Sequence, residues 1–256
     1  MKHPKTILIT GASSGIGAAL AKEYAAPGVT LGLTARNAVR LEAVAHECRE
    51  RGAVVHTGIA DVTDRVAIGA FIHHFIETHT LDLVIANAGI SAGSFGGMEK
   101  EEQARAIFET NVDGVLNTIH AALPAMLARG TGQVAIMSSL AGIRALPSAP
   151  AYSASKAAVR FYGEAMRGLL KSRGVAVSVI CPGYIRTPMT SRNPFFMPLI
   201  MSAERAARII RRGLAQGKNR IAFPRVLYFA LCLLASLPNF ISNALFDALP
   251  AKPQIS

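Results

Sequence analysis

A tyrosine and a lysine, Tyr152 and Lys156, stand four residues apart in the stretch PAYSASKAAVRFYGEAM. In a helix, residues four apart lie one turn apart on the same face. A tyrosine has an ordinary pKa of about 10, so it needs a nearby positive charge to lose a proton near neutral pH. A lysine one turn away supplies that charge, and the pair therefore predicts acid–base chemistry by Tyr152. The alternative is a surface helix that carries one tyrosine and one lysine.

A glycine-rich stretch near the N-terminus, TGASSGIG, directly follows an apolar run. Glycines at a turn between a strand and a helix let backbone N–H groups approach a pyrophosphate, whose charge the helix N-terminus stabilises. The spacing is G-x-x-x-G-x-G. Its position predicts a dinucleotide site, and a tight loop without a ligand is the alternative. The residues concerned are Gly11, Ser13, Ser14, Gly15, Ile16 and Gly17.

The elements that must position these residues alternate along the chain of 256 residues, which is 51% hydrophobic and suits one large domain. Buried strands are predicted at 6–10, 30–34, 53–58, 83–86, 133–138, 176–180 and 220–223. Helices are predicted at 17–26, 38–51, 65–78, 100–128, 154–172 and 203–216. This alternation predicts an α/β fold with a Rossmann-like, doubly wound parallel sheet of about seven strands. Ligands of such sheets bind at the carboxyl ends of the strands.

The end of the second predicted strand, GLTARN, bears on the choice of cofactor. An acidic residue there would hydrogen-bond the adenosine ribose and repel a 2′-phosphate. Ala35 and Arg36 stand there instead, and a guanidinium pairs with phosphate through its planar fork. We therefore predict NADP(H) in preference to NAD(H). The alternative is that Arg36 stacks on the adenine or faces solvent.

These motifs together resemble the classical short-chain dehydrogenase/reductase family. The matching residues follow in the family's order over about residues 5–190: TGASSGIG, Asp61-Val62, NAG at 87–89, Asn111, Ser139, Tyr152 with Lys156, and PGYIRT at 182–187. One difference is that the family often has two asparagines before Ala-Gly, whereas Ala86 precedes Asn87 here.

The resemblance implies a role for each of four catalytic residues. Tyr152 would be the general acid in carbonyl reduction and the general base in alcohol oxidation. Lys156 would bind the nicotinamide ribose and bring its charge near the phenol. Ser139 would hold the substrate oxygen, and Asn111 would support a backbone and water relay to Lys156. The cofactor would supply the hydride, and no metal is expected.

The resemblance also implies further cofactor contacts. Asp61 and Val62 would hold the adenine, and Thr187 would bond the nicotinamide amide. The remaining contacts would come from Asn87, Ala88, Gly89, Pro182, Gly183 and Ile185.

The segment at 188–201 is expected to close over the substrate, as it does in the family. Its apolar side chains are Met189, Phe195, Phe196, Met197, Leu199, Ile200 and Met201. They suit a small apolar substrate, either lipid or steroid-like, unless they pack on their own scaffold or on a neighbouring subunit. The chain is then expected to interconvert an apolar ketone and a secondary alcohol. A 3-oxoacyl-thioester reductase and a non-catalytic, cofactor-sensing protein on the same fold are the alternatives.

The formal net charge of +11 is concentrated near the C-terminus, where eight Lys and Arg residues and one acid follow from Arg205 onwards. No zinc-finger or RNA-binding signature accompanies them, so no nucleic-acid partner is expected. The apolar run at 226–237 is shorter than the about 20 residues that a spanning helix needs. We expect a catalytic domain at 1–225 and an extension at 226–256. Residues 205–246 then either contact an anionic membrane surface or pack in the core or a subunit interface.

The cysteines, the first apolar run and the family resemblance bear on the compartment and the oligomeric state. The three cysteines are far apart and predict neither a metal site nor a disulfide framework, which favours a reducing, cytoplasmic compartment. The first apolar run is too short for a signal peptide. Because the family usually forms dimers or tetramers, we expect a homo-oligomer with an interface formed by the helices predicted at 100–128 and 154–172.

Overall fold

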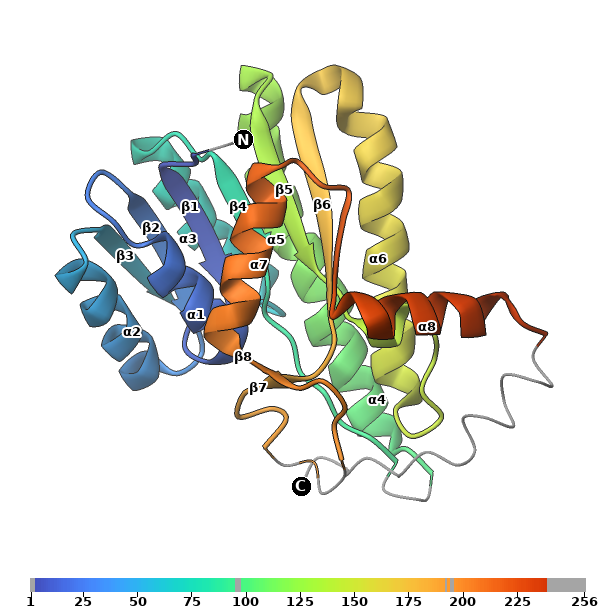
Figure 1. Cartoon of the computed structure of the whole chain (residues 1–256). Helices are drawn as coiled ribbons and strands as arrows, with labels where there is room; N and C mark the ends of the chain where they lie inside the picture. Colours follow the sequence, from blue (N-terminus) through green and yellow to red (C-terminus); the bar gives the residue numbers. More distant parts are fainter. Residues whose placement is uncertain (1–2, 95–97, 192, 194–195, 239–256) are drawn as a thin grey trace.

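A parallel sheet of seven strands, in the order β3-β2-β1-β4-β5-β6-β9, forms the centre of the molecule (Figure 1). The computed structural model describes residues 3–94, 98–191, 193 and 196–238. The strands are β1 (Thr6–Thr10), β2 (Thr30–Ala35), β3 (Val54–Ile59), β4 (Leu83–Ala86), β5 (Gly132–Met137), β6 (Val175–Pro182) and β9 (Arg220–Phe223). The Rossmann-like, doubly wound fold predicted from the alternating pattern is confirmed.

Helices cover both faces of the sheet. The helix α1 (Gly15–Tyr24) packs against α2 (Ala38–Glu50) and α7 (Ala203–Ala215) on one face. On the other face lie α3 (Arg65–Thr78), α5 (Gly114–Arg129) and α6 (Pro150–Leu170). Because both faces are covered, the central strands are almost wholly buried and apolar.

The strand order reverses at β1, which pairs with β2 on one side and with β4 on the other. The chain leaves β1 toward one edge of the sheet and returns at β4 to the opposite side. The helices that follow β1 and β4 therefore lie on opposite faces of the sheet, and a crevice opens at the carboxyl edge where the chain turns toward them. This crevice is where the predicted functional residues gather.

The region predicted as one helix at 100–128 is instead two α-helices joined by a wider turn. The helix α4 (Glu101–Phe108) runs into a π-helical turn, Glu109–Asp113, and α5 begins at Gly114. The turn contains Asn111, which is fully buried and whose side-chain amide bonds outside the helix. Such turns occur often at functional sites. A hydrophobic pattern alone does not distinguish them from regular helix.

The segment at 188–201 is held at its two ends by a short parallel pair that the sequence did not predict. This pair joins β7 (Ile185–Arg186) to β8 (Met201–Ser202). Between the two strands, Phe196 and Leu199 are exposed, whereas Met201, the first residue of β8, is buried in the core. Phe195 lies outside the described residues.

The apolar run at 226–237 forms one helix, α8 (Arg225–Ser236), which packs through Leu231 onto Leu140, Val179 and Cys181. Its opposite face exposes Val226, Phe229 and Leu233.

The arginines of α7 do not flank this exposed face. They point to solvent from the helix that packs on α1, whereas α8 lies on the α6 side of the sheet (Figure 1). In the part of the chain that the structure describes, no helix combines the length and hydrophobicity needed to cross a bilayer. Residues 239–246 of the predicted membrane contact lie outside that part.

Candidate active site

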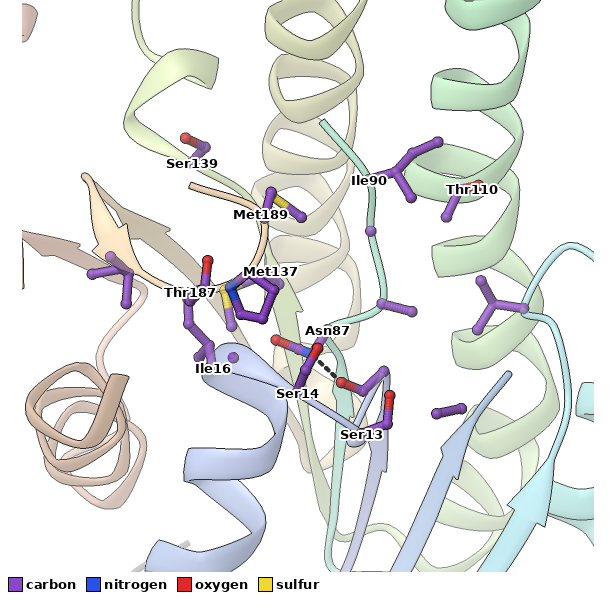
Figure 2. Close-up of a pocket in the computed structure, with 18 of the residues that line it drawn as sticks. Ser13, Ser14, Ile16, Asn87, Ile90, Thr110, Met137, Ser139, Thr187 and Met189 are labelled. Carbon is purple, nitrogen blue, oxygen red and sulfur yellow. Dashed lines mark hydrogen bonds between the residues drawn. The ribbon is translucent and has the colours of Figure 1, made fainter. Parts of the chain in front are cut away.

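A cleft of about 280 Å³ opens at the carboxyl ends of β1, β4, β5 and β6 (Figure 2). Among the residues predicted to bind the cofactor, only Gly17 does not line it. The lining includes Gly11, Ser13, Ser14, Gly15, Ile16, Arg36, Asp61, Val62, Asn87, Ala88, Gly89, Tyr152, Lys156, Pro182, Gly183, Ile185 and Thr187. The structure therefore brings together residues that lie as far as 176 positions apart in the sequence.

The glycine-rich turn has a backbone that requires glycine. Gly11 and Gly15 have φ angles of +67° and +57°, a left-handed conformation that other residues rarely adopt. Gly17 acts differently, because a Cβ there would lie 2.3 Å from the carbonyl oxygen of Gly11. Gly17 thus lets α1 begin against the turn without facing the cleft. This close-packed turn at a helix N-terminus fits the pyrophosphate of a dinucleotide.

Asn87 fixes the same turn from the neighbouring strand. Its side-chain Nδ2 donates to the backbone oxygen of Thr10 at 2.9 Å, and its backbone N–H donates to Thr10 Oγ1 at 3.1 Å. In Figure 2 the Asn87 side chain lies beside Ser14, at the turn after β1. The loop after β4 and the turn after β1 are therefore held as one unit.

Tyr152 lies in the first turn of α6, where Pro150 occupies the first helical position. Its pKa is raised, chiefly by burial, while a hydrogen bond with Ser139 opposes that effect and the nearby Tyr184 adds to it. Lys156 Nζ lies 5.9 Å from the centre of the Tyr152 ring. The one-turn spacing predicted from the sequence is confirmed.

Lys156 is 4% exposed, and its Nζ donates to the backbone oxygen of Met137 at 3.0 Å. Burial lowers the pKa of this ammonium group from 10.5 to about 8, and Cys181 opposes the shift. A Cβ at Gly89 would lie 3.2 Å from Nζ and 2.9 Å from Asn111 Oδ1. Only glycine at position 89 leaves room for both groups.

Asn111 does not line the cleft but joins three segments behind it. Its Oδ1 accepts from the Ile90 backbone N–H at 2.8 Å, and its Nδ2 donates to the Ile90 oxygen and to Ser155 Oγ, each at 3.0 Å. Ser155 Oγ in turn donates to the backbone oxygen of Tyr152 at 2.8 Å. Asn111 therefore links the loop after β4 to the helical turn that carries Tyr152.

The residues that follow β2 also line the cleft. Arg36 Nη1 lies 3.3 Å from Asp61 Oδ2 at the surface. Burial is the strongest influence on Asp61 and raises its pKa. Hydrogen bonds from Thr63 and the charge of Arg36 outweigh burial, so the pKa is lowered overall. Asp61 is thus ionised at neutral pH and holds Arg36 beside the cleft.

Several lining residues were missed by the sequence reasoning. They are Asn37, Arg40, Ala60, Ile90, Thr110, Met137, Ser138, Pro188 and Thr190. Arg40 could have been found from the sequence, because Asn37 is a typical N-cap residue and places Arg40 in the first turn of α2. In the structure, Asn37 Oδ1 accepts a hydrogen bond from the Arg40 backbone N–H at 2.9 Å. Thr110, in the π-helical turn, gave no such signal.

Comparison with known proteins agrees with this geometry. The family model described as "short chain dehydrogenase" matches residues 5–194. An uncharacterised oxidoreductase of Myxococcus xanthus is 36% identical over 245 residues, covering 95% of each chain. The 11-beta-hydroxysteroid dehydrogenase-like 2 of Arabidopsis thaliana is 32% identical over 94% of this chain and 80% of its own.

A solved structure, a short-chain dehydrogenase of Sphingobium yanoikuyae in complex with NADPH, superposes with a TM-score of 0.79 at 26% identity. It covers 95% of this chain and 96% of its own. Another structure of the same fold is bound to NAD instead, so the fold alone does not decide between the two cofactors. From the matching family model, the relatives and the shared site, the chain belongs to the short-chain dehydrogenase/reductase family.

Proposed function

We propose that this oxidoreductase interconverts an apolar ketone and a secondary alcohol with NADP(H) as the cofactor. The observation that carries the proposal is the cluster of Ser139, Tyr152 and Lys156 at one end of a cleft whose other end carries the glycine-rich turn. Figure 2 places Ser139 and the turn residues Ser13 and Ser14 at opposite ends of the view.

The chain's own residues would bind the substrate oxygen and move one proton. In carbonyl reduction, Ser139 Oγ holds the substrate oxygen and Tyr152 Oη donates a proton to it. In alcohol oxidation, Tyr152 accepts the proton, and the adjacent ammonium group of Lys156 favours the phenolate. The nicotinamide, when bound, supplies or accepts the hydride. Asn111 keeps Tyr152 in place through Ser155.

The preference for NADP(H) is supported by the charges around the end of β2. Ala35 stands where an acidic residue would repel a 2′-phosphate. Arg36 and Arg40 both line the cleft there, next to the N-terminus of α2. Two guanidinium groups and a helix N-terminus together favour a phosphate dianion.

The apolar character of the substrate is supported by the residues around the cleft mouth. Ile90, Met137 and Met189 line the cleft, and Met98 and Phe196 are exposed in segments that follow β4 and β6. Flexible apolar side chains suit a lipid or steroid-like molecule. The name of the Arabidopsis relative, a hydroxysteroid dehydrogenase, is compatible with this class. A 3-oxoacyl thioester remains the main alternative substrate.

A panel of ketones and alcohols, assayed by NADPH fluorescence, tests the proposal. We expect turnover of long or polycyclic apolar ketones with NADPH, slower turnover with NADH, and weak turnover of short polar ketones. A preference for 3-oxoacyl thioesters would show that the proposed substrate class is wrong, while the proposed hydride transfer and the role of Tyr152 would stand. If the protein binds NADPH but turns over no carbonyl compound, it is a cofactor-sensing protein.

For its partners, we propose a homo-oligomer and contact of α8 with an anionic membrane surface. The exposed Phe161 and Leu169 of α6 support a subunit interface on that helix. The exposed face of α8 carries Val226, Phe229 and Leu233 beside Arg225, with no acidic residue on the helix. A net charge of +11 favours anionic lipid over a neutral surface.

A further inference from the structure

A chain of hydrogen-bonded side chains connects α8 to the segment that carries Ser139. It begins at Tyr228 in α8, whose Oη accepts from Arg220 Nη1 of β9 at 2.9 Å. Arg220 also donates through Nε to Glu164 Oε1 of α6 at 3.0 Å, and its Nη2 contacts the same carboxylate. Arg220 thus links α8 to Glu164 of α6, which lies 56 positions earlier in the sequence.

Glu164 also binds a second guanidinium, that of Arg160 one turn earlier on α6. Arg160 Nη1 donates to both carboxylate oxygens, at 3.3 and 3.2 Å. The Arg160 side chain is only 12% exposed. A guanidinium group that is this deeply buried needs a counterion, so the position of Arg160 depends on Glu164.

Arg160 in turn holds the short 3₁₀ turn Leu140–Gly142. Its Nε donates to the backbone oxygen of Gly142 at 3.0 Å. Ser139 caps the start of this turn, because its Oγ accepts from the Ala141 N–H at 3.1 Å. The turn lies directly on α6, since a Cβ at Gly142 would be 2.7 Å from the backbone of Lys156.

We propose that Glu164 is a positioning residue for Ser139, acting through Arg160, and that Arg220 connects α8 to this arrangement. Glu164 does not line the cleft, and neither do Arg160 and Arg220, the two residues to which it is bonded. It neutralises two guanidinium groups that would otherwise repel each other. Without it, Arg160 turns toward solvent and releases the Gly142 oxygen. The expected loss of kcat rests on the proposed function, whereas the expected release of the 3₁₀ turn does not.

The kinetic test compares Glu164→Gln with a matched control, Glu47→Gln. Glu47 forms an ion pair with Lys22 at 2.7 Å between α1 and α2, away from Ser139. A misplacement of about 1 Å can lower a rate by about a hundredfold. We expect Glu164→Gln to lower kcat by roughly 10- to 100-fold with the Kd for NADPH unchanged, and Glu47→Gln to change neither. Glu164→Asp, which restores the charge, should recover most of kcat.

A double variant shows whether Glu164 acts through Arg160. If it does, Glu164→Gln with Arg160→Gln should lower kcat no further than Arg160→Gln alone. Additive losses would overturn the proposed route. An unchanged kcat in Glu164→Gln, with turnover intact in the wild type, would overturn the positioning role itself.

Amide hydrogen exchange provides a test that does not depend on turnover. Glu164→Gln should speed exchange at residues 140–146 and leave the glycine-rich turn at 11–17 unchanged. This outcome would support the role of Glu164 even if no ketone were turned over. In that case the proposed function alone would be wrong. Equal exchange in Glu164→Gln and wild type overturns the proposal. Tyr228→Phe, which removes one bond and keeps the ring, should raise exchange in α8.

Discussion

At the scale of single residues, the site depends on how burial and hydrogen bonds change the pKa values of Tyr152 and Lys156. Burial makes phenolate harder to form at Tyr152, and the bond with Ser139 partly offsets this. Burial also lowers the pKa of Lys156. The types and spacing of these residues were evident in the sequence, whereas their burial was not, because it depends on packing against β5 and β6.

Replacing Tyr152 with phenylalanine keeps the ring and removes the proton donor. We expect turnover to fall by roughly 10²- to 10⁴-fold, the range typical of a positioned acid or base. The Kd for NADPH, measured by fluorescence titration, should stay within a few fold of the wild-type value. Near-normal turnover would show that another group transfers the proton.

The depressed pKa of Lys156 predicts a pH-dependent stability. Between the folded value of about 8 and the ordinary 10.5, the unfolded chain binds more protons than the folded one. The free energy of unfolding therefore rises with pH across this window. Below pH 8 the buried ammonium destabilises the fold by roughly 3 kcal/mol.

The Lys156→Met variant has no such group, so it should be more stable than wild type at pH 7.5. This advantage should shrink as the pH approaches 10.5, as measured by urea unfolding at several pH values. If the two proteins show the same pH dependence, the pKa of Lys156 is not depressed.

At the scale of elements, the strands and most helices were predictable because each has a clear pattern. The four strands β1, β2, β4 and β9 begin at the predicted residues. The π-helical turn at Glu109–Asp113 was not predictable. It depends on bonds from Asn111 to a loop 21 residues away, which local patterns do not contain. The pair of β7 with β8 was missed for a similar reason, as each strand has two residues.

The turn from β2 into α2 should decide the choice of cofactor. We expect Arg36→Ala to weaken NADPH binding by roughly 10- to 150-fold, because a charged hydrogen bond contributes about 1.5–3 kcal/mol. NADH, which lacks the 2′-phosphate, should bind almost as before. Arg40→Ala should act in the same direction. Fluorescence titrations with both cofactors measure this, and equal weakening of both would assign Arg36 to adenine stacking or structure.

At the scale of the whole molecule, the sheet separates two surfaces that the sequence had placed side by side. The helix α7, which carries the exposed arginines, packs on α1, while α8, which carries the exposed apolar residues, lies on the α6 side of the sheet (Figure 1). The two helices are close in sequence, but β9, the edge strand of the sheet, lies between them along the chain. Only the fold could show that charge and apolar surface are on different faces.

If α8 contacts membranes, its exposed apolar side chains must carry the contact. We expect binding to vesicles of anionic phospholipid, weakened by salt, and reduced by Phe229→Ser. Val66→Ser, at an exposed apolar residue of α3, is the matched control and should bind normally. Co-sedimentation measures both variants. If the wild type ignores the vesicles and Phe229→Ser changes the oligomeric state, α8 lies in a subunit interface.

The hydrogen bonds between Asn87 and the turn after β1 determine when the nucleotide cleft can form during synthesis on the ribosome. The turn emerges first, but the side chain that fixes it follows 77 residues later. Tyr152 and Thr187, which also line the cleft, emerge later still. A nascent chain that ends before residue 187 therefore has no complete nucleotide cleft, however much nicotinamide cofactor surrounds it. A cofactor that needs the complete cleft can stabilise only a chain that extends past residue 187, and the earlier segments must begin to fold without its help.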